Sequence, residues 1–342
     1  MKKIAIVTGG SGGIGRCTAA ALQRAGCTVY EFSRREKPAE GITHLTADVT
    51  DEAQVRAAVD EVLRREGRID ILVNNAGFGI SGAAELTTSA DAHAQLELNL
   101  YGMDNATKAV LPAMRKQGSG RIVCMSSIAG ILPIPFQLWY SVSKAAINAY
   151  VLALQNEVRP FGITVCAVMP GDIASGFTDA RKKSGAGDDI YAGRIERSVA
   201  VMEKDERGGM SPEYAGSYVA KMALKEHSKP LVALGTSYKG AAVLAKGGHA
   251  AGRSDDVLVT RENVEVFPGE RIQTSNTHGT GCTLSTAVAS NLAKGLNLSE
   301  AVRRAKAYVT GALAAGLDMG HGSGPLHHGF ALQSEFTGAP DA

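Results

Sequence analysis

The fold is decided by the stretch TGGSGGIG at residues 8–15, which directly follows the apolar run IAIV at residues 4–7. Glycines permit a tight turn and let the backbone approach a ligand closely. Where such a loop leads from a strand into a helix, the unpaired N–H groups and the helix dipole favour a pyrophosphate. A glycine-rich run alone is also typical of a plain turn, but this order predicts a dinucleotide-binding βαβ unit. The expected cofactor contacts in the loop are Gly9, Ser11, Gly13, Ile14 and Gly15.

Residues 1–240 alternate short apolar runs with longer helical patterns, as βαβ units around a parallel sheet do. One connection starts at Thr50-Asp51-Glu52, repeats valines at helical spacing and stops at Gly67. The predicted class is α/β, with a Rossmann-type doubly wound parallel sheet. The predicted strands are Ile4–Val7, Thr28–Phe32, His44–Ala47, Ile69–Val73, Arg121–Met125, Ile163–Val168 and Leu231–Leu234.

The composition is that of a globular protein with a small-molecule partner. Apolar residues make up 44% of the 342 residues and charged residues 20%. With 36 basic and 34 acidic residues, the net charge of +2 provides no strong field for nucleic acid or a membrane surface. The five scattered cysteines indicate neither a disulfide framework nor a metal site. No apolar run approaches the roughly 18 residues of a membrane span, so we expect a cytoplasmic protein.

The end of the second predicted strand bears on which dinucleotide binds. A carboxylate at this position binds the ribose 2′-OH of NAD, whereas an arginine accommodates the 2′-phosphate of NADP. Ser33 and Arg34 therefore predict NADP, with NAD as the second choice and a solvated basic turn as the alternative. Asp48 follows the third strand, where it either accepts hydrogen bonds near the adenine or caps the next helix.

The fourth predicted strand is followed by two asparagines and two small residues, Asn74-Asn75-Ala76-Gly77. Small side chains let the backbone lie against a cofactor, and asparagine side chains can brace neighbouring strands. A bare turn is the alternative interpretation. The expected cofactor contacts here are Asn75, Ala76 and Gly77.

The candidate chemistry lies in Ser127, Tyr140 and Lys144. Tyr140 and Lys144 are four residues apart at the start of an apolar helical pattern, so they share a face. A tyrosine hydroxyl, with a pKa of ~10, exchanges protons poorly near neutrality unless a cation stabilises the phenolate. Lys144 can supply that cation, and Ser127 can hydrogen-bond a carbonyl oxygen that gains or loses hydride. A lone Tyr-x-x-x-Lys is usually a solvated helix face.

These motifs occur in the order and spacing of the short-chain dehydrogenase/reductase family, which residues of about 3–236 resemble. The resemblance rests on the glycine loop, 74–77, Asn99, 126–130, Tyr140 with Lys144, and Pro170-Gly171. It implies that Tyr140 is the general acid/base and that Ser127 polarises the substrate oxygen. It further implies that Lys144 lowers the tyrosine pKa and binds the nicotinamide ribose, and that Asn99 holds a water that relays protons.

The same resemblance implies further contacts and partners. Nicotinamide contacts are expected from Pro170, Gly171, Ile173 and Ser175, which stands where many members have threonine. The implied substrate is a small alcohol or ketone, and the implied assembly is a homodimer or homotetramer. Residues 131–139 line the pocket in this family, and their apolar content favours a lipophilic substrate, although packing at a subunit interface is the alternative. Residues 177–210 would form a substrate lid.

Residues 243–330 resemble the C-terminal part of hydroxymethylpyrimidine/phosphomethylpyrimidine kinase, of the ribokinase-like fold. The resemblance rests on residues 246–249, 255–258, 276–282 and 305–309. It implies an appended α/β fragment in which Gly279-Thr280-Gly281 cradles a phosphoryl group and Cys282 is the catalytic base. Two helices are predicted, at 282–293 and from Ser299, the second with an apolar stripe from Val302 to Leu313.

The first half of that kinase family has no counterpart in the chain. Pyrimidine phosphorylation by the segment therefore remains an alternative to a packing or oligomerisation module, and the module is the expectation. Residues 331–342 are predicted to be a flexible tail.

Overall fold

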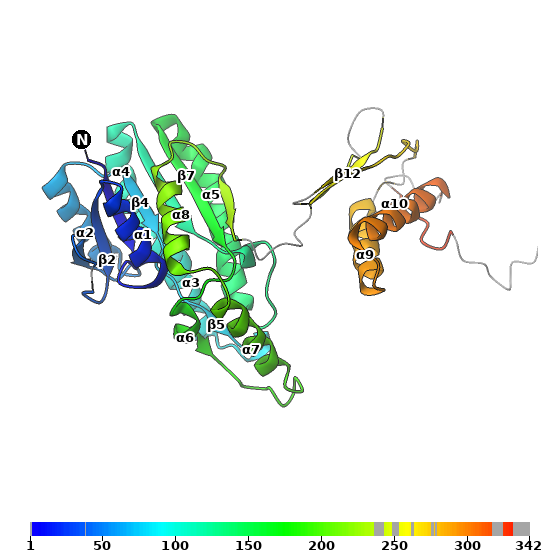
Figure 1. The fold of residues 1–342 in the computed structure, drawn as a ribbon, viewed down its shortest axis with the longest axis horizontal. Coiled ribbons are helices and arrows are strands. Elements are labelled where there is room, and N and C mark those ends of the chain that lie inside the picture. The colour runs from blue at the N-terminus through cyan, green and yellow to red at the C-terminus, as the bar shows by residue number, and fades with distance from the viewer. Residues whose placement is uncertain are drawn as a thin grey trace, which may run out of the picture. The chain divides into compact units, whose positions relative to one another are not determined.

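The computed structural model describes residues 2–37, 39–235, 243–247, 253–260, 263–274, 277, 279–316 and 324–330. The chain divides into two compact units, Met1–Tyr238 and Lys239–Ala342 (Figure 1). The motif residues Gly248, His249, Asn276 and His278, and the predicted tail 331–342, lie outside the described residues.

The first unit contains a seven-stranded parallel sheet in the order β3-β2-β1-β4-β6-β7-β9. The direction of winding changes between β1 and β4, which makes the sheet doubly wound. All seven predicted strands are present, with ends shifted by at most two residues. Their bounds are β1 Ile4–Thr8, β2 Thr28–Ser33, β3 Thr43–Thr46, β4 Ile71–Asn74, β6 Gly120–Met125, β7 Ile163–Pro170 and β9 Leu231–Leu234.

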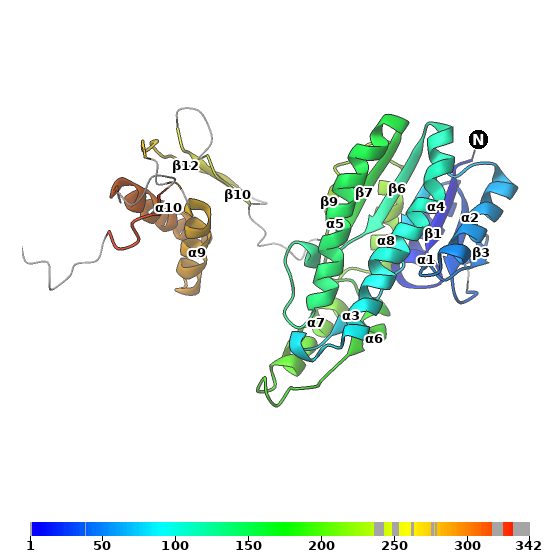
Figure 2. The ribbon, with the colours of Figure 1, turned by 180° about the vertical axis from the view of Figure 1, so that it is seen from behind.

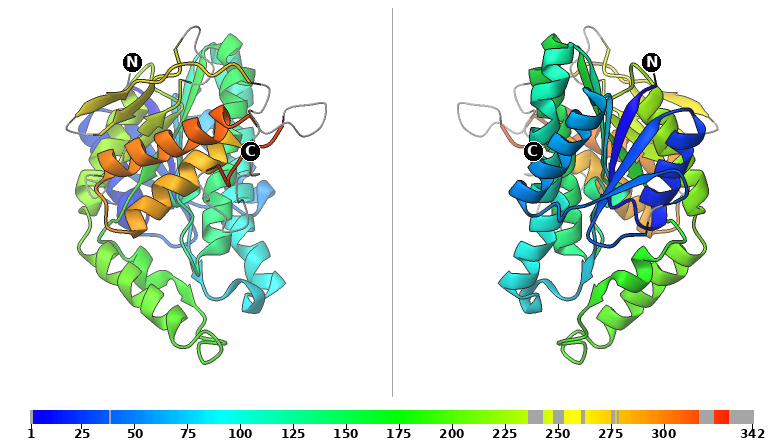
Figure 3. Two further views of the ribbon diagram at one scale, coloured as in Figure 1. Left: turned by 90° about the vertical axis from the view of Figure 1, so that its right-hand side faces the viewer. Right: turned by 90° about the vertical axis from the view of Figure 1, so that its left-hand side faces the viewer.

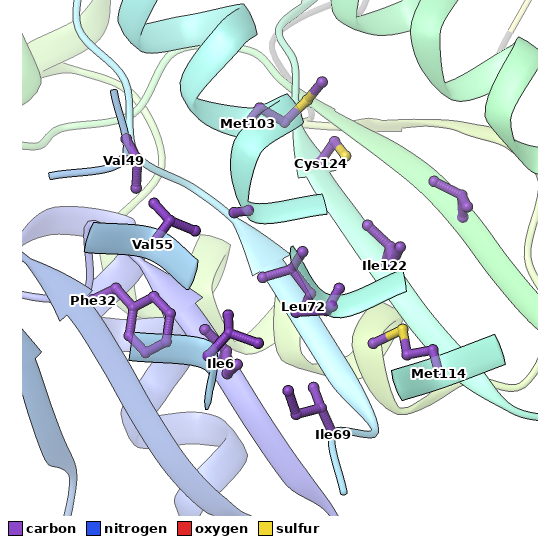
Figure 4. Close-up of a cluster of buried hydrophobic side chains, with 14 of the residues drawn as sticks. Ile6, Phe32, Val49, Val55, Ile69, Leu72, Met103, Met114, Ile122 and Cys124 are labelled. Carbon is purple, nitrogen blue, oxygen red and sulfur yellow. The ribbon is translucent and has the colours of Figure 1, made fainter. Parts of the chain in front are cut away.

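Helices cover both faces of this sheet (Figures 1 and 2). On one face lie α1 (Gly13–Arg24) and α8 (Pro212–Leu224), whose apolar residues pack on β1, β4, β6 and β7. On the other face lie α2 (Glu52–Glu66), α4 (Gly102–Gln117) and α5 (Leu138–Val158). Figure 4 shows the second of these cores, where Phe32 and Ile6 of the strands lie near Val55 of α2, and Met114 of α4 lies near Ile122 of β6.

The helix α2, which connects β3 to β4, begins and ends where its local sequence predicts. The Asp51 carboxylate accepts hydrogen bonds from the N–H groups of Ala53 and Gln54 and so caps α2, and Gly67 ends the helix in a left-handed conformation. The buried face carries Val55, Val59 and Val62, as the spacing predicts. Asp48 does not cap this helix. Its carboxylate accepts from the backbone and hydroxyl of Thr50 instead.

Short elements extend beyond the carboxyl ends of the strands (Figure 3). The strands β5 (Ile80–Ser81) and β8 (Lys182–Lys183) pair in parallel there. The segment between β7 and α8 also forms α6 (Phe177–Ala180) and α7 (Arg194–Arg207). The remaining helical elements are the 3₁₀ turns Ala84–Leu86, Ile128–Gly130 and Arg159–Phe161, the helix α3 at Ser89–Leu96 and a π-helical turn at Glu97–Tyr101.

The second unit is a small antiparallel sheet with two helices. Its strands, in the order β10-β11-β12, are Val243–Ala245, Asp256–Val259 and Val264–Phe267, and its helices are α9 (Thr280–Ala293) and α10 (Leu298–Ala314). Both predicted helices are present. The α10 stripe is buried, with Val302 against Leu258 and Phe267 of the sheet and Val309 against Leu284 of α9.

A polar contact also joins α10 to the sheet of the second unit. Lys306 Nζ donates to Asp256 Oδ2 at 2.7 Å and to the Ser254 carbonyl at 2.8 Å. The segment is thus folded around its own small core. In the parts of the chain that the structure describes, no helix has the length and apolarity that a membrane crossing needs.

Candidate active site

A cavity of about 460 Å³ opens at the carboxyl ends of the central strands. Ser127, Tyr140 and Lys144 line it together with the glycine loop. Of the predicted site residues only Gly15 and Asn99 do not line it. The lining residues that the sequence predicts are Gly9, Ser11, Gly13, Ile14, Ser33, Arg34, Asp48, Asn75, Ala76, Gly77, Ser127, Tyr140, Lys144, Pro170, Gly171, Ile173 and Ser175.

The glycine loop is pressed against the end of β4. Gly9 has a φ of +65°, and a Cβ there would lie 2.9 Å from the Ala76 Cα. A Cβ on Gly15 would lie 2.4 Å from the Gly9 carbonyl oxygen. Gly15 therefore serves the close packing of α1 on the loop, which explains why it does not line the cavity.

The predicted bracing by asparagine is present. Asn75 Nδ2 donates to the carbonyls of Thr8, at 3.1 Å, and Gly9, at 3.2 Å. The Thr8 hydroxyl in turn accepts from the backbone N–H groups of Asn75 and Ala76. These bonds fix the ends of β1 and β4 side by side under the cavity.

Arg34 lies at the rim of the cavity beyond β2. Its side chain is 75% exposed, and its Nη1 lies 3.8 Å from Asp48 Oδ2. The nearby acidic residue Glu31 is fully buried, pairs with His44 and does not line the cavity. The cation at this rim is therefore accessible, whereas the Glu31 carboxylate is not.

Tyr140 and Lys144 lie in the first turns of α5. Lys144 Nζ donates to the Met125 carbonyl at 2.7 Å and lies 5.6 Å from the centre of the Tyr140 ring. Lys144 is buried, and burial lowers its pKa to about 8. Because a cation near a phenol favours the phenolate, this arrangement suits proton exchange by Tyr140 near neutral pH.

Ser127 lies in the loop after β6 and lines the same cavity as Tyr140 and Lys144. Ser127 Oγ accepts from the Ala129 N–H at 3.1 Å, which leaves the hydroxyl proton available for a ligand. The neighbouring Ser126 hydroxyl donates to the Lys144 carbonyl at 3.0 Å and so ties this loop to α5.

Asn99 lies behind the cavity in the π-helical turn. Its side chain accepts from the Phe78 N–H at 3.0 Å and donates to the Phe78 carbonyl at 3.1 Å. Its Nδ2 also lies 3.1 Å from Ser143 Oγ on α5. Asn99 thus joins the loop after β4 to α5, which carries Tyr140 and Lys144, and its role in a proton relay stays a prediction.

The apolar segment 131–139 contributes less to the cavity than expected. Ile134 and Gln137 line it, but Ile131 and Leu132 do not, and their side chains are more than half exposed. Phe177 of α6 also lines the cavity, and its ring centre lies 5.8 Å from that of Tyr140. The sequence contains no periodic pattern that distinguishes Phe177 from the other residues of segment 177–210.

The segment after β7 also contributes two acidic residues that were not predicted from the sequence. Asp172 and Glu206 line the cavity, and Glu206 forms an ion pair with the buried Arg181. Burial, together with Asp205 and Glu206, raises the pKa of Asp172.

A doubly wound sheet, a glycine loop and a tyrosine–lysine pair in one cavity define an oxidoreductase of the nicotinamide-dependent α/β class.

Comparison with known proteins identifies the family. Residues 3–186 match the short chain dehydrogenase family, and the chain belongs to it. Members of this family use NAD(P) and act on alcohols or ketones. Residues 219–327 match the phosphomethylpyrimidine kinase family, so the chain joins the two, as its motifs predict.

Individual relatives agree with this assignment. The chain is 44% identical over 231 residues to a 3-ketodihydrosphingosine reductase from Bacteroides thetaiotaomicron, a match that covers 66% of this chain and 85% of that protein. A solved short-chain dehydrogenase from Streptomyces avermitilis is 32% identical, with a TM-score of 0.63, over 69% of this chain and 90% of that one. The NADP-bound structure of ElxO is 26% identical, with a TM-score of 0.58, over 70% of this chain and 100% of that one.

Proposed function

We propose that the first unit is an NADP(H)-dependent reductase of a lipophilic ketone. The observation that carries the proposal is that Tyr140, Lys144 and Ser127 line one cavity with the glycine loop and Arg34. In such a reaction the three side chains act on the substrate oxygen and its proton, and the glycine loop and Arg34 bind the cofactor.

The residues around the glycine loop fit a dinucleotide. A Cβ on Gly12 or Gly13 would meet nothing within 4 Å, so the cavity is open over the loop. Among the described residues no side chain caps the N-terminus of α1, whose N–H groups can therefore bind a pyrophosphate. Arg34 would bind the 2′-phosphate, and Lys144 would bind the nicotinamide ribose.

Bound NADPH supplies the hydride that is added to the carbonyl carbon. Tyr140 donates its phenolic proton to the carbonyl oxygen, which completes the alcohol. Ser127 donates a hydrogen bond to the same oxygen and so holds it beside the phenol. Lys144 stabilises the phenolate that remains after the transfer. The reverse sequence oxidises an alcohol.

The substrate that we propose is a long-chain ketone of the 3-ketodihydrosphingosine type. The 44% identity to a reductase of that name supports it. The apolar side chains of Phe78, Leu98, Ile134 and Phe177 along the cavity also suit an alkyl chain.

The test is NADPH oxidation with 3-ketodihydrosphingosine by the wild type and by Tyr140→Phe. Phenylalanine removes only the transferable proton, so turnover should fall by about 10²–10⁴-fold while NADPH binding is kept. No oxidation by the wild type would refute the substrate, and an active phenylalanine variant would refute the mechanism.

We further propose that the reductase acts as a homodimer or homotetramer. Large apolar side chains are exposed along α5, at Leu138, Val142 and Leu152, and in two helical turns, at Tyr101 and Phe161. The mass of the protein in solution tests this directly.

For the second unit we propose a packing module and not a working kinase. The match to the phosphomethylpyrimidine kinase family favours phosphorylation of a pyrimidine as the alternative. However, the described part of this unit is a three-stranded sheet with two helices, whose apolar faces pack on each other. Because the first half of that kinase family has no counterpart in the chain, we propose that the acceptor pocket is incomplete.

A further inference from the structure

One wall of the cavity carries carboxylates. Asp172 follows the Pro170-Gly171 turn at the end of β7, and Glu206 lies in the last turn of α7. Both residues line the cavity with Tyr140. Carboxylates in a pocket that otherwise suits an alkyl chain need a physical explanation, because burying a charge is costly unless it is paired.

The backbone holds this wall in place. The Met210 N–H donates to the Asp172 carbonyl at 3.0 Å. A Cβ on Gly209 would lie 2.4 Å from the carbonyl carbon and oxygen of Asp172, so only glycine permits this approach. The chain just after α7 is therefore fixed against the backbone of Asp172, and Glu206 lies close enough to act electrostatically on the Asp172 carboxylate.

Glu206 already has partners within the protein. Arg181, whose side chain is fully buried, pairs with its Oε1, and the Thr178 hydroxyl donates to its Oε2 at 2.7 Å. The Arg181 guanidinium carbon lies 5.7 Å from the centre of the Phe177 ring, which in turn contacts Tyr140. Both Glu206 oxygens are thus occupied, and this ion pair buttresses the ring beside the proton donor.

Asp172 is in a different situation. In the described part of the first unit no cationic side chain pairs with its carboxylate. The charged neighbours that act on it, Asp205 and Glu206, are both acidic, and together with burial they raise its pKa. A cationic group of a ligand would relieve this repulsion and would gain a charge-assisted hydrogen bond.

We infer that Asp172 is a specificity-determining residue that binds the ammonium group of an amino-ketone substrate. The inference rests on the proposed function and deepens it, because 3-ketodihydrosphingosine carries an amine on the carbon next to its ketone. The ketone oxygen would face Tyr140 and Ser127 while the ammonium group faces Asp172. Neutral long-chain ketones lack that contact.

The test compares the binding of decylamine and decanol to the protein with NADP⁺. The two ligands share a chain and differ in charge. The wild type should bind decylamine about tenfold more tightly or better, the usual worth of a charged hydrogen bond. Asp172→Asn should abolish the difference, whereas Asp205→Asn, which removes an equal charge from an exposed residue outside the cavity lining, should keep it. Equal binding of both ligands by the wild type, or a preference that survives Asp172→Asn, would overturn the inference.

Two further arms separate this inference from the substrate proposal. If the wild type prefers decylamine but does not reduce 3-ketodihydrosphingosine, the proposed substrate fails and the role of Asp172 stands. If it reduces that ketone and its N-acetylated, uncharged analogue with the same kcat/KM, Asp172 has no such role. Asp172→Glu keeps the charge and should retain the preference for decylamine, which covers the case that the asparagine variant does not fold.

Discussion

Replacing Lys144 by methionine is expected to stabilise the reductase unit while abolishing turnover. Burial lowers the pKa of Lys144 from its usual 10.5 to about 8. A difference of this size means that the lysine charge costs the folded state about 3 kcal/mol. Methionine has a similar length and no charge, but it loses the hydrogen bond from the charged lysine to the Met125 carbonyl, worth about 2 kcal/mol. The net gain in unfolding free energy is therefore about 1 kcal/mol at pH 7.

The gain should depend on pH in a defined direction. Below pH 8 Lys144 is protonated in both the folded and the unfolded state, so the full cost is present. Between pH 8 and 10.5 the unfolded chain binds more protons than the folded protein, and wild-type stability rises relative to the variant. The advantage of Lys144→Met should accordingly fade across this window.

Urea unfolding at pH 7 and pH 9.5 measures this difference. The chain contains one tryptophan, Trp139, which lies in α5, so its fluorescence reports on the first unit alone. Lys116→Met, which removes an exposed lysine from α4, is the matched control and should change stability little. A methionine variant of Lys144 that is less stable than the wild type by the same amount at both pH values would refute a costly buried charge.

Two other predictions concern the cofactor and the second unit. Arg34→Ala should weaken NADPH binding roughly tenfold and leave NADH binding unchanged, because only NADPH has the 2′-phosphate, and calorimetric titration with both cofactors would show it. An equal loss for both would contradict the role of Arg34. The full chain with ATP and hydroxymethylpyrimidine should form no phosphorylated product by mass spectrometry, because holding one reactant without a pocket for the other forfeits the advantage of positioning. Product that disappears in Cys282→Ala would instead make the chain bifunctional.

Local signals account for most of what the sequence predicts correctly. A capping aspartate at 51, valines at helical spacing and a glycine at 67 predict the α2 helix. Each of these signals depends only on residues that are close together in the sequence. The strands at the centre of a parallel sheet are buried on both faces, so they are continuous apolar runs that stand out. The site motifs lie directly after such strands, where the fold places ligands.

Contacts over long sequence distances account for what the sequence does not predict. Phe177 and Glu206 reach the cavity from the segment between β7 and α8, and no periodicity in the sequence encodes the path of that segment. Asp172 lines the cavity from the end of β7, where no residue pattern distinguishes it. The apolar content of Ile131 and Leu132 favours a buried lining, yet both are exposed. Which apolar residues line a cavity depends on loop geometry, which composition does not specify.

The edge strand β9 has a consequence for how such a chain could arise. The kinase-family match begins at residue 219, inside α8, and so includes β9, which pairs with β7 alone. A recombination event inside this terminal helix–strand unit replaces the last strand of the sheet and disturbs one neighbour, whereas the same event at β4 would disturb two. The outermost βα unit is thus the place where an open parallel sheet tolerates recombination, and a foreign segment can enter there while Ser127, Tyr140 and Lys144 stay in the cavity.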